Sequence, residues 1–334
     1  MEPRSTILIT GGTGSFSEKF VPLTLEKFNP KKLIIYSRDE MKQWLMAQRY
    51  SCDKRVKFVL GDVRDKERLE TSFAGVDYVV HAAATKIVPT AEYNPIECIK
   101  TNINGAINVI EASLKTGIKK VISLSTDKAS NPINLYGATK LASDKLFIAA
   151  NIIDESKVTK FSVVRYGNVM GSRGSVIPFF MQRSKSGKLP ITDKNMTRFM
   201  ITLDQAVDLV WDAFSDMLGG EIYVKKIPSM NIIDIARAVS SESDLEIIGI
   251  RPGEKVHEQM IGSEDSRYTY EYDHYYKILP MLNDLYKDKH RIKKGIKVNE
   301  NFSYTSDSNS EWMTIEYLKN WITKNYGQLN KEIY

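Results

Sequence analysis

The first half of the chain alternates short apolar runs with longer stretches in which apolar residues recur at helical spacing. The runs predicted to be strands are residues 6–9, 33–36, 56–60, 76–81, 121–124 and 161–165. The helices predicted between them run from the first glycine turn to residue 28 and across residues 40–50, 92–115 and 135–153. Continuous apolar strands that alternate with helices are typical of a parallel sheet buried on both faces.

This regular alternation ends after Gly167, where glycine and proline become frequent. A helix at 203–216 and a strand at 221–224 are predicted beyond it, followed by an irregular stretch around Arg251-Pro252-Gly253. We therefore predict an α/β fold with a Rossmann-type doubly wound parallel sheet in residues 1–168, to which a segment near 203–225 returns. Residues 169–334 are predicted to form mainly a smaller C-terminal substrate-binding lobe. The charged stretch 287–294 is expected to lie on the solvated surface.

Composition narrows the class of protein. The chain has 334 residues, 42% of them hydrophobic, and a net charge of +6 with both signs interspersed. This is the balance of a globular protein with no nucleic-acid partner. Because no run of about 18 apolar residues occurs and residues 1–4 carry no export signal, we predict no membrane partner and a cytoplasmic location. Two cysteines and four scattered histidines predict neither a disulfide framework nor a metal site.

A glycine-rich turn, Thr10-Gly11-Gly12-Thr13-Gly14-Ser15-Phe16-Ser17, directly follows the first strand and opens the first helix. Glycine allows a tight turn and the close approach of backbone N–H groups to a pyrophosphate. Ser17 takes the place of the third glycine of such turns, where we expect it to loosen the turn. The predicted dinucleotide contacts are Gly11, Thr13, Gly14, Ser15 and Phe16, and a purely structural turn is the alternative.

Cofactor choice is determined at the end of the second strand. An acidic residue there would bind the ribose hydroxyls of NAD. Here Ser37, Arg38 and Lys42 provide a hydroxyl and two cations, which suit the 2′-phosphate of NADP. The adjacent Asp39 leaves NAD open, unless it caps the following helix. Residues 1–168 are thus predicted to bind NADP, with further contacts at the next two strand ends from Asp62, Val63, Ala82 and Ala83. For Asp62 and Val63, a polar strand end without a ligand is the alternative.

Candidate catalytic residues follow the strand at 121–124. Tyr136 and Lys140 are four positions apart in the next helix and therefore share one face. The ammonium of Lys140 is expected to lower the pKa of the phenol from about 10. Such a pair is common on protein surfaces, but together with the glycine turn and Thr126 at the strand end it predicts hydride chemistry.

Asp127 and Lys128 lie next to Thr126. A simple alcohol dehydrogenase or epimerase has no need of this adjacent acid and base. The pair therefore predicts a second proton-transfer task, namely elimination. An exposed loop pair is the alternative.

The run from residue 125 to residue 140 resembles the inverting UDP-N-acetylglucosamine 4,6-dehydratases of the pseudaminic-acid pathway, within the extended short-chain dehydrogenase/reductase family. The resemblance extends from the first strand to about residue 310, with further matching stretches at 36–40, 91–95, 165–168, 171–175, 196–199 and 251–255. Departures are Ser17, Met170 in place of valine and Met200 in place of tryptophan. Tyr136, where membrane-embedded retaining relatives have methionine, indicates the branch that inverts C5.

The resemblance implies roles for the catalytic residues. Tyr136, helped by Lys140, would take the proton of the C4 hydroxyl, and Thr126 would orient the C4 oxygen. Lys128 would remove the C5 hydrogen and Asp127 would protonate the departing C6 hydroxyl. A basic Lys128 requires a pKa below about 10.4, which we expect burial and the nearby Lys140 to cause.

The resemblance also implies the ligands. The substrate would be UDP-N-acetylglucosamine and the product UDP-2-acetamido-2,6-dideoxy-β-L-arabino-hexos-4-ulose, for a bacterial surface glycan. The implied substrate contacts are Asn168, Ser175, Val176, Arg198, Arg251 and Glu254, with Lys86 as a further candidate at a strand end. A homo-oligomer, by resemblance a hexamer, would be the working form. A UDP-sugar 4-epimerase and a non-catalytic nicotinamide-sensing regulatory protein are the alternatives.

Overall fold

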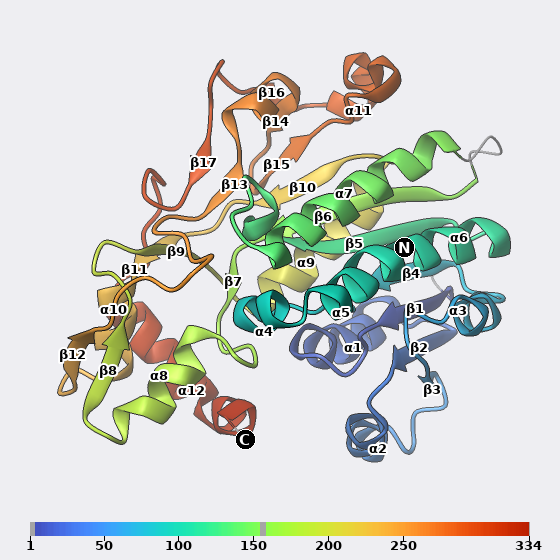
Figure 1. The fold of residues 1–334 in the computed structure, drawn as a ribbon. Coiled ribbons are helices and arrows are strands. Elements are labelled where there is room, and N and C mark those ends of the chain that lie inside the picture. The colour runs from blue at the N-terminus through green and yellow to red at the C-terminus, as the bar shows by residue number, and fades with distance from the viewer. Residues whose placement is uncertain (1–3, 154–157, 334) are drawn as a thin grey trace.

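The computed structural model describes residues 4–153 and 158–333. The prediction that the N-terminus carries no export signal concerns residues that, before Arg4, lie outside the described part. A central sheet of ten strands has the order β16-β14-β15-β10-β6-β5-β4-β1-β2-β3 (Figure 1). Its strands are β1 (Thr6–Thr10), β2 (Lys32–Ser37), β3 (Val56–Leu60), β4 (Tyr78–His81), β5 (Lys120–Thr126), β6 (Lys160–Tyr166), β10 (Ile222–Lys225), β14 (Thr269–Glu271), β15 (Tyr275–Ile278) and β16 (Ile296–Lys297). From β3 to β10 every neighbouring pair is parallel, and β15, β14 and β16 extend the sheet in antiparallel fashion.

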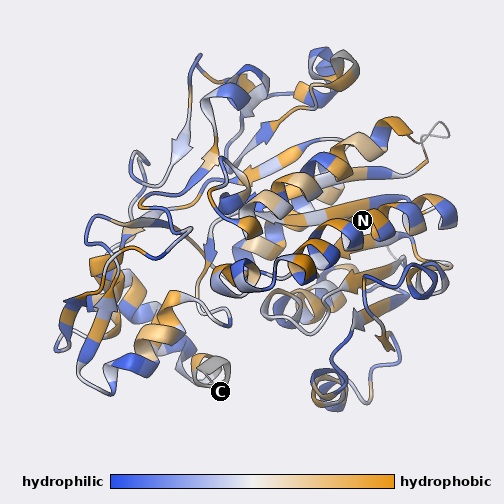
Figure 2. Cartoon of the chain, in the orientation of Figure 1, coloured by the Kyte–Doolittle hydropathy of each residue, from blue (hydrophilic) through white to orange (hydrophobic). Residues whose placement is uncertain are grey.

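Helices cover both faces of the sheet, which confirms the predicted doubly wound α/β fold. They are α1 (Ser15–Phe28), α2 (Glu40–Arg49), α3 (Lys66–Phe73), α6 (Gly105–Thr116), α7 (Leu135–Ile153) and α9 (Leu203–Asp216). One layer pairs α1 with α9, and the other joins α3, α6 and α7. The strands between the two layers are predominantly hydrophobic (Figure 2), as expected of a sheet buried on both faces.

The predicted helix at 92–115 is wrong as one element. The segment divides into α4 (Val88–Tyr93), α5 (Pro95–Ile99), a π-helical turn (Lys100–Asn104) and α6. The break falls at Asn94, because the following Pro95 has no N–H to continue a helix and favours the first position of a new one. The π-helical turn directs Asn102 inward, where its side-chain amide donates to Thr139 Oγ1 of α7 at 3.0 Å.

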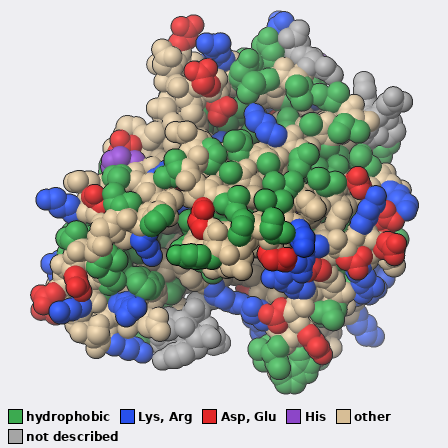
Figure 3. All heavy atoms as spheres, viewed as in Figure 1, with side chains coloured by type: hydrophobic (Ala, Val, Ile, Leu, Met, Phe, Trp, Pro, Cys, Tyr) green, Lys and Arg blue, Asp and Glu red, His purple; other side chains and the backbone are tan. Residues whose placement is uncertain are grey.

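Helix α2 is unusual because Met41, Trp44 and Leu45 are exposed on it, and they form the hydrophobic cluster at the lower edge of Figure 3. Its inner face is held instead by a buried amide. Gln43 Nε2 donates to the carbonyl of Ser37 at 2.9 Å and to the carbonyl of Val59 at 2.9 Å. Helix α2 is therefore fixed to the end of β2, where the predicted cofactor residues lie.

Residues after β6 build a second group of elements with its own hydrophobic core. It contains β7 (Asn168–Val169), α8 (Val176–Ser184), β8 (Lys188–Ile191), β9 (Thr197–Ile201), β11 (Ser229–Asn231), α10 (Ile232–Val239), β12 (Asp244–Ile247) and α12 (Ile315–Ile333). Met170 and Met200, which depart from the family pattern, are both buried in this core. A short antiparallel pair, β13 (Gln259–Ile261) with β17 (Tyr304–Thr305), lies between this group and the main sheet (Figure 1).

The expectation of a fully solvated segment at 287–294 is wrong for Arg291. This residue belongs to the short helix α11 (Lys289–Ile292), and its guanidinium is buried against Glu221 at 2.5 Å. A charge alternation in sequence cannot reveal this, because the partner lies 70 residues away. Among the described residues, no helix is long and apolar enough to cross a membrane.

Candidate active site

One cavity of about 900 Å³ lies at the carboxyl ends of the parallel strands, between the sheet and the second group of elements. Every residue predicted above to bind cofactor or substrate or to act in catalysis lines it. Strands β5 and β6 pair in register up to Thr126 and Tyr166, so that β5 delivers the catalytic turn directly to the cavity floor. This is the edge at which open parallel sheets bind ligands.

The glycine turn lies at one end of the cavity. Gly11 has φ +66°, and a Cβ there would meet the backbone of Ala82 and Ala83 at 2.8–2.9 Å, so no side chain fits. The Ser17 hydroxyl is buried and donates to the carbonyl of Gly11 at 3.0 Å. The expectation that serine loosens the turn is therefore wrong, because the hydroxyl adds a bond across it. The free N–H groups at the start of α1 face the cavity and suit an anionic pyrophosphate.

The end of β2 is organised around Ser37. Its hydroxyl accepts from Gln43 Nε2 at 3.1 Å and from Thr13 Oγ1 at 3.3 Å. Asp39 accepts from the backbone N–H of Lys42 at 2.9 Å and pairs with its ammonium at 2.8 Å. Asp39 is thus the N-cap of α2, and Lys42 lowers its pKa. A carboxylate that caps a helix is not directed at ribose hydroxyls, whereas Arg38 remains largely exposed at the cavity edge.

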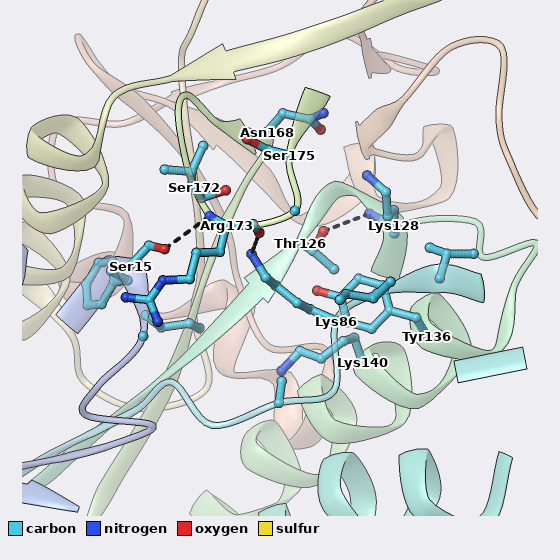
Figure 4. Close-up of a pocket in the computed structure, with 18 of the residues that line it drawn as sticks. Ser15, Lys86, Thr126, Lys128, Tyr136, Lys140, Asn168, Ser172, Arg173 and Ser175 are labelled. Atoms are coloured by element: carbon cyan, nitrogen blue, oxygen red, sulfur yellow. Dashed lines mark hydrogen bonds between the residues drawn. The ribbon is translucent and has the colours of Figure 1, made fainter. Parts of the chain in front are cut away.

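The residues predicted to be catalytic line the cavity together, and Figure 4 shows Thr126, Lys128, Tyr136 and Lys140 among them. A 3-10 turn (Asp127–Ala129) follows β5 and carries Asp127 and Lys128, and α7 begins shortly after it at Leu135 and carries Tyr136. Thr126 Oγ1 donates to Asp127 Oδ1 at 2.8 Å, and Lys128 Nζ lies 3.1 Å from the same carboxylate. Asp127 is fully buried, so the alternative of an exposed loop pair is wrong.

A second carboxylate, which the sequence analysis missed, completes this centre. Glu258 immediately precedes β13, is almost fully buried, and lies 3.1 Å from Lys128 Nζ through Oε1. The ammonium of Lys128 therefore lies between two buried carboxylates. Nothing in the spacing of Glu258 relative to residues 125–140 signals this contact, since it depends on how β13 packs against the catalytic turn.

This arrangement shifts the pKa values of the acidic and basic groups. Burial raises the pKa of Asp127; Lys128 opposes this only in part, and the charge of Glu258 adds to it. Burial alone would raise the pKa of Glu258, but Lys128 and Arg198 hold it below its usual value. Burial alone would lower the pKa of Lys128, but Asp127 and Glu258 raise it. The expected lowering of the Lys128 pKa is therefore wrong, because burial comes with two counter-charges.

The expected lowering of the Tyr136 pKa is also wrong. Burial raises it to about 12, and Lys128 and a hydrogen bond with Thr126 compensate only in part. Lys140 has a lowered pKa because it is buried, with Asp144 opposing. Behind these residues, Asp144 accepts from the Ser125 hydroxyl at 2.7 Å and pairs with Arg165 at 3.3 Å. This buried network fixes α7 against β5 and β6 and so fixes the orientation of the catalytic face.

The predicted substrate residues line the far side of the cavity. Arg251 is exposed and holds Glu254 through two bonds of 3.0 and 3.1 Å. Arg198 is buried, and its guanidinium donates to the carbonyls of residues 197, 255 and 256. Ser175 is the N-cap of α8, and its buried hydroxyl has no hydrogen-bond partner among the described residues. Asn168 and Val176 lie in β7 and at the start of α8.

A loop of the second group reaches back to the glycine turn. Lys86 Nζ donates to the carbonyl of Arg173 at 2.9 Å, and the backbone N–H of Arg173 donates to Ser15 Oγ at 3.2 Å (Figure 4). Arg173, in a stretch already noted for its resemblance, is a second cavity residue that the sequence analysis did not single out. Within the described part of the chain, no cluster of His, Cys, Asp and Glu could hold a metal ion.

Comparison with known proteins agrees with this geometry. Residues 7–280 match the family described as polysaccharide biosynthesis protein. The UDP-N-acetylglucosamine 4,6-dehydratase (inverting) of Campylobacter jejuni subsp. jejuni serotype O:2 is 54% identical over 97% of this chain and 99% of its own. A UDP-glucose 4-epimerase of Rickettsia canadensis is 41% identical over 97% of each chain. The solved structure of Pen from Bacillus thuringiensis superposes with a TM-score of 0.89 at 34% identity, covering 98% of this chain and 99% of that one. The chain therefore belongs to the polysaccharide biosynthesis family of extended short-chain dehydrogenases/reductases, in the branch of the inverting UDP-N-acetylglucosamine 4,6-dehydratases.

Proposed function

We propose that the protein is a hydro-lyase that removes water from UDP-N-acetylglucosamine across C5 and C6 and inverts C5. The product is UDP-2-acetamido-2,6-dideoxy-β-L-arabino-hexos-4-ulose. The observation that carries this conclusion is the buried Asp127–Lys128 pair beside Tyr136 and Lys140 in one cavity. The two pairs divide the chemistry into oxidation at C4 and elimination at C5 and C6. The similarity to the Campylobacter dehydratase supports the same activity.

The cavity fits a nicotinamide dinucleotide, because the Gly11 turn leaves room for a pyrophosphate and the start of α1 supplies N–H donors. Ser37, Arg38 and Lys42 favour NADP over NAD, since Asp39 is engaged as a helix cap. The other proposed contacts are Thr13, Gly14, Ser15, Phe16, Asp62, Val63, Ala82, Ala83, Tyr136 and Lys140. When bound, a nicotinamide would supply the hydride acceptor for oxidation at C4 and the hydride donor for reduction at C6, and would thus be regenerated in each turnover.

In the proposed reaction, Tyr136 takes the proton of the C4 hydroxyl while Thr126 orients the oxygen. A phenol with a pKa near 12 is a weak acid, so Tyr136 must lose its proton as the site fills, and the charge of Lys128 favours that loss. The C4 ketone then acidifies the C5 hydrogen. Lys128 removes this hydrogen, and Asp127, whose raised pKa favours the protonated acid, delivers a proton to the C6 oxygen. A proton from solvent that reaches C5 from the opposite face inverts that centre, and Tyr136 returns the C4 hydroxyl proton to solvent, so that the proton count closes.

For the nucleotide part of the substrate, we propose that Arg251 and Arg198 bind the diphosphate, because guanidinium groups match phosphate oxygens. Glu254 would then exchange its bonds to Arg251 for the uridine ribose. The unpartnered hydroxyl of Ser175, with Val176, suits the uracil ring, and Asn168 and Lys86 complete the contacts. We also propose a cytoplasmic homo-oligomer, by resemblance a hexamer, that supplies a surface glycan of the pseudaminic-acid type.

A UDP-sugar 4-epimerase is the second candidate, because the Rickettsia relative with that name shares 41% identity. It would use Tyr136 and Lys140 and leave Asp127 and Lys128 without a task. A nicotinamide-sensing regulatory protein would turn over no sugar.

The decisive experiment is NMR of the reaction with UDP-N-acetylglucosamine in deuterated water, with no cofactor added. We expect a 6-deoxy-4-keto product of L-arabino configuration with deuterium at C5. A product that is only the C4 epimer and keeps its 6-hydroxyl would replace dehydration by epimerisation. Unchanged substrate, with and without added NADP or NAD, would favour the regulatory reading.

A further inference from the structure

Glu258 is rigidly placed at the catalytic centre although no proposed step so far uses it. Its backbone is fixed on both sides by Ser306, whose hydroxyl accepts the Glu258 N–H at 2.8 Å and whose N–H donates to the Glu258 carbonyl at 2.8 Å. One carboxylate oxygen contacts Lys128 Nζ at 3.1 Å. The other, Oε2, is buried and has no hydrogen-bond partner among the described residues. A buried, half-satisfied carboxylate is costly, so its position calls for a functional explanation.

The charges around Lys128 restrict what this lysine can do. Two carboxylates share one ammonium. Groups in such close contact titrate as a unit, and their pKa values are driven apart. Asp127 is pushed toward its protonated form and Glu258 toward its ionised form. These directions favour a starting arrangement with the proton on Asp127, an ammonium on Lys128 and a carboxylate on Glu258.

An ammonium cannot remove the C5 hydrogen, so Lys128 must first lose a proton. Asp127 cannot receive it, because its own proton is needed by the C6 oxygen. Among the described residues, the other acidic group in contact with Lys128 Nζ is Glu258. Its distance of 3.1 Å is within range for direct proton transfer.

At rest the proton stays on Lys128, because Asp127 and Glu258 raise its pKa while Lys128 and Arg198 lower that of Glu258. A diphosphate bound to Arg198, which lies 3.9 Å from Glu258 Oε1, would compensate this cation and make Glu258 a better proton acceptor. We propose that, with substrate bound, Glu258 accepts the ammonium proton of Lys128 and thereby makes Lys128 the base of the elimination. This inference rests on the proposed function. Because Glu258 acts on the substrate only through Lys128, it is a positioning residue.

The proton count closes over the elimination step. An N–H bond of Lys128 breaks and an O–H bond forms at Glu258, which leaves a lone pair on Nζ. That lone pair takes the C5 proton, the C5–H electrons form the C5–C6 double bond, and the C6–O bond breaks as Asp127 protonates the leaving oxygen to water. Lys128 is then an ammonium again, Asp127 a carboxylate and Glu258 an acid. Lys128 touches both carboxylates, so it passes the proton of Glu258 on to Asp127 and restores the resting state.

The pH response of this unit depends on every charged group that faces it. These groups are Asp127 and Tyr136 from the catalytic strand end and α7, Arg198 from β9, and Lys255 and Glu258 from the segment before β13. In the wild type, Lys128 is deprotonated internally, so elimination needs no loss of its proton to solvent. Without the Glu258 carboxylate, the proton must leave to solvent, and the rate of elimination should rise with pH.

The test is Glu258→Gln, which keeps the shape of the side chain but cannot take up the proton. Reduced nicotinamide, followed by its near-ultraviolet absorbance after mixing with UDP-N-acetylglucosamine, reports oxidation at C4. NMR in deuterated water reports the 6-deoxy product and exchange at C5. We expect reduced nicotinamide to accumulate while product formation and C5 exchange fall by about 100-fold, the lower range for loss of a proton-transfer group. The remaining rate should rise with pH.

Glu221→Gln is the matched control, because Glu221 is also buried and ion-paired but lies outside the cavity lining. It should lower thermal stability without separating the two half-reactions. If Glu258→Gln does not fold, Glu258→Asp retains the charge at a greater distance and should show a weaker form of the same separation. Wild-type product formation and pH profile in Glu258→Gln would overturn the inference, as would an equal loss of both half-reactions. A wild-type enzyme that makes no 6-deoxy product would instead overturn the proposed function.

Discussion

Gly137 couples the two pairs of catalytic residues, and Gly137→Ala tests that coupling. The residue lies in the first turn of α7, next to Tyr136. Alanine in a helix interior is usually favourable by about 1 kcal/mol relative to glycine. At Gly137, however, the added Cβ would lie 2.2 Å from the carbonyl oxygen of Lys128 and 3.0 Å from Pro132 Cβ. The first contact is with backbone, so a side-chain rotation cannot relieve it.

An ordinary contact begins near 3.4 Å, so α7 and the catalytic turn would have to separate by about 1 Å. Overpacking of this kind costs roughly 1–3 kcal/mol, which exceeds the helix-propensity gain. A displacement of about 1 Å between reacting groups costs about 100-fold in rate. We therefore expect Gly137→Ala to lower turnover to the 6-deoxy product by about 100-fold and to lower thermal stability.

The matched control is Gly327→Ala in α12, where a Cβ would meet no atom within 4 Å. It should stabilise the protein by roughly 0.5–1 kcal/mol and leave turnover unchanged. Thermal unfolding and NMR product assays on both variants provide the comparison. Wild-type turnover in Gly137→Ala, or a stability gain like that of Gly327→Ala, would refute the coupling of α7 to the catalytic turn.

Three further substitutions test separate parts of the structure. Gly11→Ala should yield protein that purifies without nucleotide, because the added Cβ would collide with the Ala82–Ala83 backbone. The control Gly75→Ala has a similar φ of +73° but no atom within 4 Å of the added Cβ, so it should retain the nucleotide. The nucleotide released on denaturation measures the content of both variants. Asp127→Asn should lower 6-deoxy product formation by about 10²–10⁴-fold while reduced nicotinamide still forms on mixing with substrate; undiminished product would exclude Asp127 as the acid. Burial lowers the pKa of His81 from 6.5 to about 3, so protonation favours the unfolded chain and stability is lost as the pH falls below about 6.5. Between pH 7 and pH 5 this lowers the free energy of unfolding by about 2 kcal/mol. His81→Asn keeps a hydrogen-bond partner for Thr10 but has no titratable ring. In urea unfolding, its free energy of unfolding should therefore fall by about 2 kcal/mol less than that of the wild type over the same pH range.

Local pattern was sufficient to predict most of the fold. The helices at 135–153 and 203–216 begin and end where the apolar spacing predicts, because each packs one apolar face on the sheet. The helix at 92–115 was mispredicted because its apolar spacing continues through Pro95 and the π-helical turn. Periodicity records which face is buried, and it does not record a change in the backbone hydrogen bonding.

The site was predicted less completely than the fold, for a physical reason. Residues that follow strand ends, such as Thr126 and Asp127, could be assigned to one edge of the sheet from topology alone. Glu258 could not, since it reaches Lys128 only when β13 packs against the catalytic turn. The predicted pKa shifts of Lys128 and Tyr136 had the wrong sign because each left out the dominant cause. The prediction for Tyr136 considered a neighbouring lysine and left out burial, which dominates its shift. The prediction for Lys128 considered burial and Lys140 and left out the carboxylates of Asp127 and Glu258.

The division of the site between two parts of the fold bears on how relatives should be compared. Tyr136 and Lys140 lie on α7, against the sheet, and an epimerase would need the same pair there. By our proposal, elimination depends on Asp127 and Lys128 and on Glu258 from the segment before β13, all of which are in contact through Lys128. A relative named as a 4-epimerase shares 41% identity with this chain over nearly its whole length. Overall identity measures the common fold and its hydride chemistry. Dehydration should require two carboxylates in contact with Lys128, those of Asp127 and Glu258, whereas epimerisation should not.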